Sequence, residues 1–180
     1  MKLTIVRHGQ TNYNVLRLNN ADPNIDVHLT KDGITEAKKI ARQLKDEPFD
    51  AIFVSELPRT KQTASYINEF HHLPLIEDAR LNDIKNGFEG KSVTEYHDMR
   101  NSSNDPFTFR VAANAESSED VYERTESFLE HLTHLPYQNV LIVTSRHNLR
   151  HFRNIIDNID PRKTLQNQVA NTEVIIRTLA

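Results

Sequence analysis

The sequence contains no cysteine and no tryptophan, and only four of its 180 residues are glycine. Without cysteine the chain can form neither a disulfide bond nor a zinc ribbon, and it cannot use a thiol as a nucleophile. No two glycines have the spacing of the GxGxxG motif, which excludes a dinucleotide-binding fold built on that loop. So little glycine also excludes collagen-like and glycine-rich linker sequences.

The sequence also lacks an excess of charge and a long apolar run. Lys and Arg number 22 against 25 Asp and Glu, which gives a net charge of -3 spread evenly along the chain. This balance gives no reason to expect nucleic acid or a membrane as a partner. No apolar run approaches the length of about 20 residues that spans a bilayer, and the segment before Arg7 is too short for a signal peptide. We therefore expect a cytoplasmic protein, which also fits the absence of cysteine.

Short apolar runs alternate with helical periods along the chain. Residues 3–6, 51–54, 140–143 and 174–176 are continuous and mostly β-branched, as in strands buried on both faces. Amphipathic stripes over residues 34–44, 121–132 and 149–159 predict helices. The alternation predicts a three-layer α/β/α fold with a mostly parallel central sheet flanked by helices.

We expect one domain over residues 1–180, which is an ordinary domain length. Thr30 is a candidate N-cap for the first helix, and Ser117 with Asp120 forms a candidate capping box for the second. Residues 81–114 are polar and less regular, which is long for a loop. We expect this segment to lie over a functional site.

Arginines and histidines follow three of the predicted strands. Arg7 and His8 follow the first, Arg59 comes shortly after the second, and Ser145-Arg146-His147 follow the third. Ligands of a parallel sheet bind beyond the carboxyl ends of its strands, where these side chains would meet. Arginine forks match phosphate oxygens in pairs, so the pattern predicts a phosphate site.

Five segments, taken in order, carry a resemblance to one family. Residues 7–14 (RHGQTNYN) are similar to its RHGxTxxN signature, and residues 26–33 (DVHLTKDG) to D-x-P-L-T-x-x-G with histidine for proline. Residues 55–64 (SELPRTKQTA) are similar to S-x-L-x-R-A-x-x-T-A. Residues 81–90 and 115–124 resemble L-x-E…G-x-W-E-G and G-E-S-x-x-D-V…R. Over nearly its whole length the chain resembles the histidine phosphatase (phosphoglycerate mutase-like) superfamily.

The resemblance implies phosphoryl transfer without a cofactor. In such enzymes the first histidine attacks a phosphoryl group, and water or an acceptor hydroxyl then discharges the phosphohistidine. His8 matches that nucleophile, Arg7 and Arg59 match the phosphate clamp, and Thr11 and Asn14 would be secondary polar contacts. Cationic neighbours lower the pKa of an imidazole, which favours the neutral form that attacks.

The sequence differs from the family pattern at two positions, and the first is the residue that acts as the acid. The family places Glu in L-x-E to protonate the leaving oxygen, and here Asp83 matches it. Aspartate can act as a general acid, but it is one methylene shorter, and the adjacent segment is about one residue short. We predict Asp83 as the acid, with Glu89 as a nearby alternative.

The second difference lies directly after the third predicted strand, where the family pattern is V-S/T-H-G and supplies a second histidine. Ser145 stands at that histidine and Arg146 at that glycine. Serine cannot donate a cationic hydrogen bond, and loss of one such donor costs on the order of 2–4 kcal/mol of transition-state stabilisation. Arg146 and His147 are the possible substitutes. His147 and His151 have a metal-ligand spacing, but no HExxH glutamate lies between them, so we predict no metal site.

These residues predict a phosphomonoester hydrolase that acts through a phosphohistidine on His8, impaired by the loss of the second histidine. The alternatives are a catalytically weak or inactive relative that binds phosphorylated ligands, and a mutase-type phosphotransferase. We expect a small phosphorylated metabolite as the ligand, and a monomer or homodimer.

Overall fold

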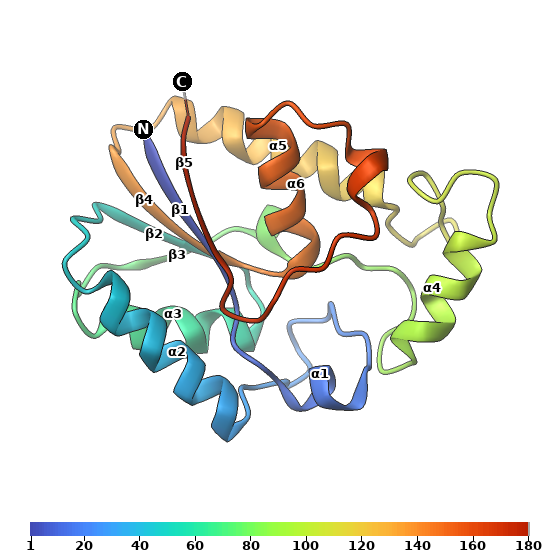
Figure 1. The fold of residues 1–180 in the computed structure, drawn as a ribbon, viewed down its shortest axis with the longest axis horizontal. Coiled ribbons are helices and arrows are strands. Elements are labelled where there is room, and N and C mark those ends of the chain that lie inside the picture. The colour runs from blue at the N-terminus through green and yellow to red at the C-terminus, as the bar shows by residue number, and fades with distance from the viewer. Residues whose placement is uncertain (180) are drawn as a thin grey trace.

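The central sheet has five strands in the order β3-β2-β4-β1-β5 (Figure 1). The computed structural model describes residues 1–179. The strands are β1 (Lys2–Arg7), β2 (Ala51–Val54), β3 (Leu75–Glu77), β4 (Asn139–Thr144) and β5 (Val174–Thr178). All neighbouring pairs are parallel except β1 with β5, so the predicted mostly parallel sheet is confirmed. The short edge strand β3 was not predicted, because none of its three residues is fully buried.

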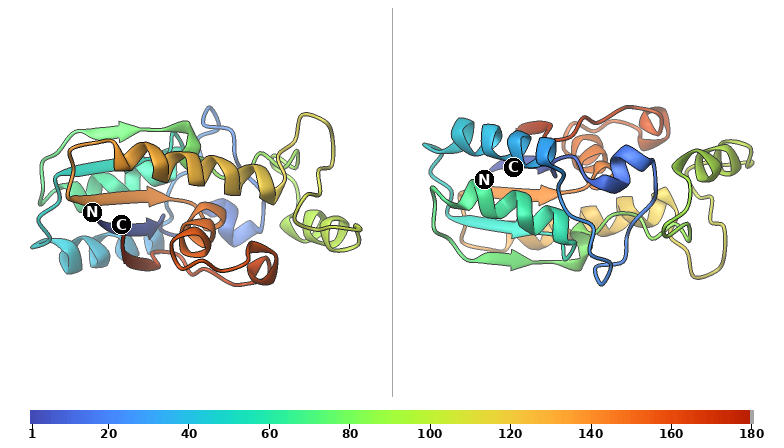
Figure 2. Two further views of the ribbon diagram at one scale, coloured as in Figure 1. Left: turned by 90° about the horizontal axis from the view of Figure 1, so that it is seen from above. Right: turned by 90° about the horizontal axis from the view of Figure 1, so that it is seen from below.

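Helices cover both faces of the sheet (Figures 1 and 2). The helices are α1 (Asn12–Leu16), α2 (Lys31–Leu44), α3 (Pro58–Asn68), α4 (Val93–Asn101), α5 (Ser118–Thr133) and α6 (Arg146–Ile156), with 3-10 turns η1 (Ala79–Leu81) and η2 (Pro161–Thr164). On one face Val6 and Ile52 pack with Ile40 of α2 and Ile67 of α3. On the other, Ile5 packs with residues of α5 and α6. The continuous apolar strands are thus buried from both sides, and the three layers are confirmed.

The predicted caps form as the sequence indicates. Thr30 Oγ1 accepts the backbone N–H of Gly33 at 3.1 Å at the start of α2. Ser117 Oγ accepts from the Asp120 N–H at 3.2 Å, and the Asp120 carboxylate accepts from the Ser117 N–H at 2.7 Å. The helix predicted over residues 149–159 is α6, which has the same length but lies three residues earlier, at Arg146–Ile156. It ends at Ile156 and is followed by Asn158 in the left-handed conformation, so Ile159 lies outside it.

Residues 81–114 are more regular than expected, because they contain α4. Ser92 caps this helix by accepting the N–H groups of Thr94 and Glu95. The helix buries only Tyr96 and Arg100, so the sequence has no apolar stripe to reveal it. It projects beyond the carboxyl ends of the strands (Figure 2).

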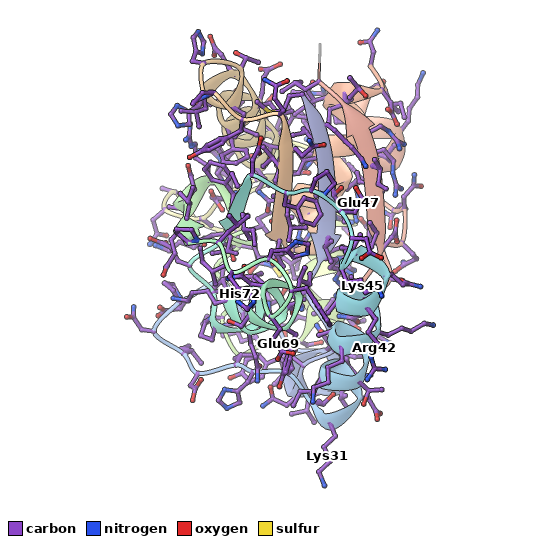
Figure 3. The ribbon with its side chains drawn as sticks, turned by 90° about the vertical axis from the view of Figure 1, so that its left-hand side faces the viewer. Lys31, Arg42, Lys45, Glu47, Glu69 and His72 are labelled. Atoms are coloured by element: carbon purple, nitrogen blue, oxygen red, sulfur yellow. The ribbon has the colours of Figure 1, made fainter. Side chains whose placement is uncertain are left out.

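Helix α2 shows how the sequence divides between core and solvent. Ala37, Ile40 and Leu44 are buried against the sheet. Lys31, Arg42 and Lys45 point outward from the same helix (Figure 3). In the part of the chain that the structure describes, none of the helices is both long and apolar enough to cross a membrane.

Candidate active site

The loop after β1 is held in place by backbone contacts. The N–H of His8 donates to the Thr144 carbonyl of β4 at 3.0 Å, and the N–H of Gly9 donates to Thr63 Oγ1 of α3 at 3.1 Å. A Cβ on Gly9 would lie 2.5 Å from the carbonyl oxygen of Gly33 at the start of α2. The absence of a side chain therefore lets this loop dock against two helices.

The buried imidazole of His8 is fixed in one tautomer. Arg59 Nε, which can only donate, lies 3.0 Å from His8 Nε2, so Nε2 carries the lone pair. The ring proton is then on Nδ1, which donates to the Gly9 carbonyl at 2.8 Å. Burial, followed by Arg59 and Arg7, holds the pKa of His8 well below its usual value. His8 is thus a neutral imidazole with its free electron pair beside a guanidinium.

The two predicted clamp arginines line the same cavity as His8, and Arg59 contacts its Nε2. Arg59 of α3 is almost fully buried, and its Nη atoms donate to the side-chain and backbone oxygens of Asn20. Arg7 Nη1 donates to the Val169 carbonyl. Burial, followed by Arg146, lowers the pKa of Arg7 to about 10, so it stays cationic at neutral pH. Both arginines and His8 line one cavity of about 340 Å³.

Asp83 and His147 form a pair on the wall of the same cavity. His147 Nδ1 donates to Asp83 Oδ1 at 2.8 Å, and Asp83 Oδ2 lies 3.4 Å from Arg59 Nη2. Burial raises the pKa of Asp83, but His147 and Arg59 outweigh it and hold that pKa below its usual range. Burial lowers the pKa of His147 to about 3, against the opposing effect of Asp83. A carboxylate therefore orients a neutral imidazole, and His147 Nε2 has no partner among residues 1–179.

The structure separates the three residues that follow β4. Ser145 is fully buried at the start of α6 and does not line the cavity, although its Oγ lies 3.5 Å from Arg59 Nη2. Arg146 and His147 do line the cavity. The two possible substitutes for the second histidine thus reach the wall, while the residue at its sequence position does not.

Thr11 and Asn14 line the cavity but are engaged with each other. Thr11 Oγ1 accepts the Asn14 N–H at 3.1 Å, and Asn14 Oδ1 accepts the Thr11 N–H at 3.1 Å. This capping box starts α1. Their contact with phosphate stays a prediction.

Several lining residues were missed by the sequence reasoning. They are Tyr13, Arg17, Asn20, His97, Gln168 and Asn171. Asn20 holds Arg59, and Asn171 Nδ2 donates to the His8 carbonyl at 3.1 Å. No periodicity marks these loop asparagines, but His97 could have been noticed as a histidine within the segment expected over the site. Among residues 1–179, no three His, Asp or Glu side chains are grouped to hold a metal ion.

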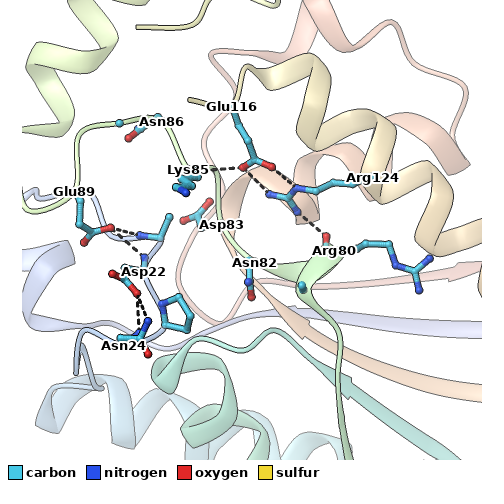
Figure 4. A pocket seen from close by; sticks show the side chains of 14 residues that line it. Asp22, Asn24, Arg80, Asn82, Asp83, Lys85, Asn86, Glu89, Glu116 and Arg124 are labelled. Atoms are coloured by element: carbon cyan, nitrogen blue, oxygen red, sulfur yellow. Dashed lines mark hydrogen bonds and ion pairs between the residues drawn. The ribbon is translucent and has the colours of Figure 1, made fainter. Parts of the chain in front are cut away.

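A second cavity of about 750 Å³ lies on the other side of Asp83 (Figure 4). Of the predicted site residues it contains Asp83 and the alternative acid Glu89. The Glu89 carboxylate on its wall accepts from Asn20 Nδ2 at 2.8 Å and from the Ala21 N–H at 2.7 Å. Glu89 therefore fixes the loop that holds Arg59, and of these two carboxylates only Asp83 also lines the cavity of His8.

Comparisons with known proteins show the family to which this chain belongs. A family model described as histidine phosphatase superfamily (branch 1) matches residues 3–179. Fructose-2,6-bisphosphatase TIGAR of Xenopus tropicalis is 35% identical over 138 residues, 74% of this chain and 50% of that protein. A putative phosphoserine phosphatase of Hydrogenobacter thermophilus is 32% identical over 148 residues, 79% of this chain and 71% of that protein. The chain thus spans about half the length of the first relative.

Solved structures show the same fold. The alpha-ribazole phosphatase from Shigella flexneri superposes with a TM-score of 0.83 at 24% identity, over 98% of this chain and 89% of that one. Bacillus stearothermophilus YhfR gives a TM-score of 0.82 at 24% identity, over 97% and 89%. Since one family model covers nearly every residue and the fold is shared, the chain belongs to branch 1 of the histidine phosphatase superfamily.

Proposed function

We propose that this chain hydrolyses small phosphomonoesters through a phosphohistidine formed on His8. The observation that carries the proposal is the neutral imidazole of His8, with Nε2 3.0 Å from Arg59 Nε in a cavity that Arg7 also lines. A phosphoryl group that takes over Arg59 Nε would free the electron pair of His8 Nε2 for attack, and Arg7 is a further donor in the same cavity. The cavity volume of about 340 Å³ fits a small metabolite.

The first step joins His8 to phosphorus. His8 Nε2 attacks, the bond from phosphorus to the ester oxygen breaks, and the Nδ1–H remains on the Gly9 carbonyl. Arg7 and Arg59 neutralise charge on the equatorial oxygens. The ester oxygen needs a proton, and we assign this proton to His147 Nε2 with Asp83 holding Nδ1. A phosphate dianion beside His147 raises the pKa of the imidazole, so Nε2 takes up a proton from solvent when the substrate binds.

The second step reverses these roles. Water attacks phosphorus, its proton goes to His147 Nε2, and the phosphorus–nitrogen bond breaks to return the electron pair to His8. A carboxylate that orients the far side of an imidazole is the arrangement that makes histidine a general base in hydrolases. The pair therefore offers a physical substitute for the glutamic acid and the second histidine that this chain lacks.

One observation favours a different function, binding of phosphorylated ligands without turnover. Ser145 supplies no charge at the position of the second histidine, and it is buried away from the cavity. In that case the arginines would hold phosphate, but the charge-assisted donor of the second histidine would be missing during its transfer.

Turnover of a panel of phosphomonoesters, with acid-quenched protein examined for phosphorylated His8 by mass spectrometry, tests the proposal. We expect turnover and a trapped phosphohistidine in the natural chain, and neither in His8→Asn. His72→Asn is the matched control, because His72 is exposed and its left-handed backbone suits asparagine. Tight phosphate binding without turnover, with activity gained in Ser145→His, would establish the binding function instead.

A further inference from the structure

The guanidinium of Arg146 lies at the cavity without a partner. Arg146 is the first residue of α6 and lines the cavity beside His147. Within residues 1–179 it forms neither a hydrogen bond nor an ion pair. Arg59, by contrast, is held by Asn20 and Asp83, and Arg7 by the Val169 carbonyl. Arg146 is therefore not required to support a neighbouring side chain.

The cavity has more positive charge than one phosphoryl group offsets. Its walls include Arg7, Arg17, Arg59 and Arg146, and Asp83 is the one carboxylate among its lining residues. The histidines add no charge at neutral pH, since burial followed by Arg146 lowers the pKa of His97 to about 4. A phosphate dianion would leave a net positive wall, which attracts a further anion.

Buried arginines behind Arg146 strengthen this field. Arg150 and Arg100 are only 4% and 3% exposed. Arg150 Nε and Nη1 have no hydrogen-bond partner in the described chain. Burial, followed by Arg146, lowers the pKa of Arg150 to about 9. Because a buried charge without a counterion is costly, an anion bound at Arg146 would stabilise this whole group.

We propose that Arg146 forms a second anion subsite, and that the substrate is a phosphomonoester carrying a further carboxylate or phosphate group. This inference rests on the proposed function, because the phosphoryl group at His8 defines the first subsite. The planar guanidinium suits either anion by donating two parallel hydrogen bonds. Arg146 thereby selects substrates by binding and stands apart from the nucleophile.

Binding of two non-hydrolysable phosphonates tests the subsite without turnover. 3-Phosphonopropionate and propylphosphonate differ in one carboxylate. By calorimetry we expect the natural chain to prefer the first by about 10- to 100-fold, the worth of one charge-assisted contact. Arg146→Ala should remove the preference, and Arg146→Lys should keep part of it. Arg153→Ala on the same helix is the control, because Arg153 pairs with Glu173 outside the cavity.

Steady-state kinetics then identify the anion and separate this inference from the proposed function. 3-Phosphoglycerate against glycerol 3-phosphate tests a carboxylate, and glucose 1,6-bisphosphate against glucose 6-phosphate tests a second phosphate. We expect Arg146→Ala to reduce the preference mainly through KM. Equal binding of both phosphonates by the natural chain, or a preference that survives in Arg146→Ala, would overturn the subsite. A preference lost in Arg146→Ala without any turnover would support the subsite and refute the hydrolase.

Discussion

At the scale of single residues, the proposed chemistry depends on two histidines, His8 and His147, that are neutral and each fixed in one tautomer. His8 Nε2 accepts a hydrogen bond from Arg59 Nε, and the Nδ1–H of the same ring donates to the Gly9 carbonyl. His147 has one nitrogen on Asp83 and the other without a partner in the described chain. In the proposed mechanism these two imidazoles, held by different partners, act separately as nucleophile and proton carrier.

Asp83 and His147 are expected to act as one unit. Asp83→Asn and His147→Asn should each reduce kcat by about 10²- to 10⁴-fold, the usual range for a general acid–base group. The double variant should cost little more than either single one, because removal of one member already disables the pair. Steady-state kinetics of the three variants and the natural chain measure this. Losses that multiply would show that the residues act independently.

At the scale of elements, the site depends on close backbone approach between the loop after β1 and α2. A Cβ on Gly33 would lie 2.0 Å from the carbonyl oxygen of Gln10. The N–H of Thr30 donates to the same carbonyl at 2.9 Å, so the loop cannot retreat without losing that bond. The start of α2 thus fixes the position of the loop that carries His8.

Gly33→Ala is therefore expected to destabilise the protein, although alanine favours a helix more than glycine. We expect a loss of about 1–3 kcal/mol in the free energy of unfolding, typical of overpacking at a site that cannot relax. Chemical denaturation measures it. Gly90→Ala is a comparison in which the introduced Cβ has open space and only the positive φ of 68° is strained. An unchanged or raised stability in Gly33→Ala would contradict this account of the contact.

At the scale of the whole molecule, the fold keeps three histidines neutral in its interior. They are His8, His147 and His151, and burial is the largest cause that lowers each pKa. His151 lies outside the catalytic cavity, with Nε2 3.1 Å from Ser118 Oγ and its ring against Tyr122 and Phe107. As the pH falls, these histidines are protonated at a higher pH in the unfolded chain than in the folded one.

Stability should consequently fall in mild acid. Each histidine contributes stability that is present above its unfolded pKa of about 6.5 and is lost as the pH falls below it. The loss is about 1 kcal/mol per histidine between pH 6.5 and 5.5. Urea denaturation at several pH values should show a smaller loss in His151→Gln than in the natural chain. His72→Gln is the control because His72 is exposed, and equal slopes in all three proteins would refute this prediction.

The sequence by itself determined the layers, the four main strands, the caps of α2 and α5, and the grouping of Arg7, His8 and Arg59 at one cavity. These features follow from local periodicity and from side chains that directly follow a strand. It did not reveal α4, since that helix buries only Tyr96 and Arg100. Nor did it indicate Asn20 as the partner of Arg59, because that contact joins residues far apart in the chain.

Only the tertiary structure decided between the residues that follow β4. The sequence placed Ser145 at the missing histidine and left Arg146 and His147 as two possible substitutes. The start of α6 turns Ser145 into the core and leaves Arg146 and His147 on the cavity wall. Asp83, which lies on a distant segment, then reaches His147 Nδ1 at 2.8 Å. The physical reason is that helix geometry fixes which way each side chain points, and only packing brings its partner within hydrogen-bond distance.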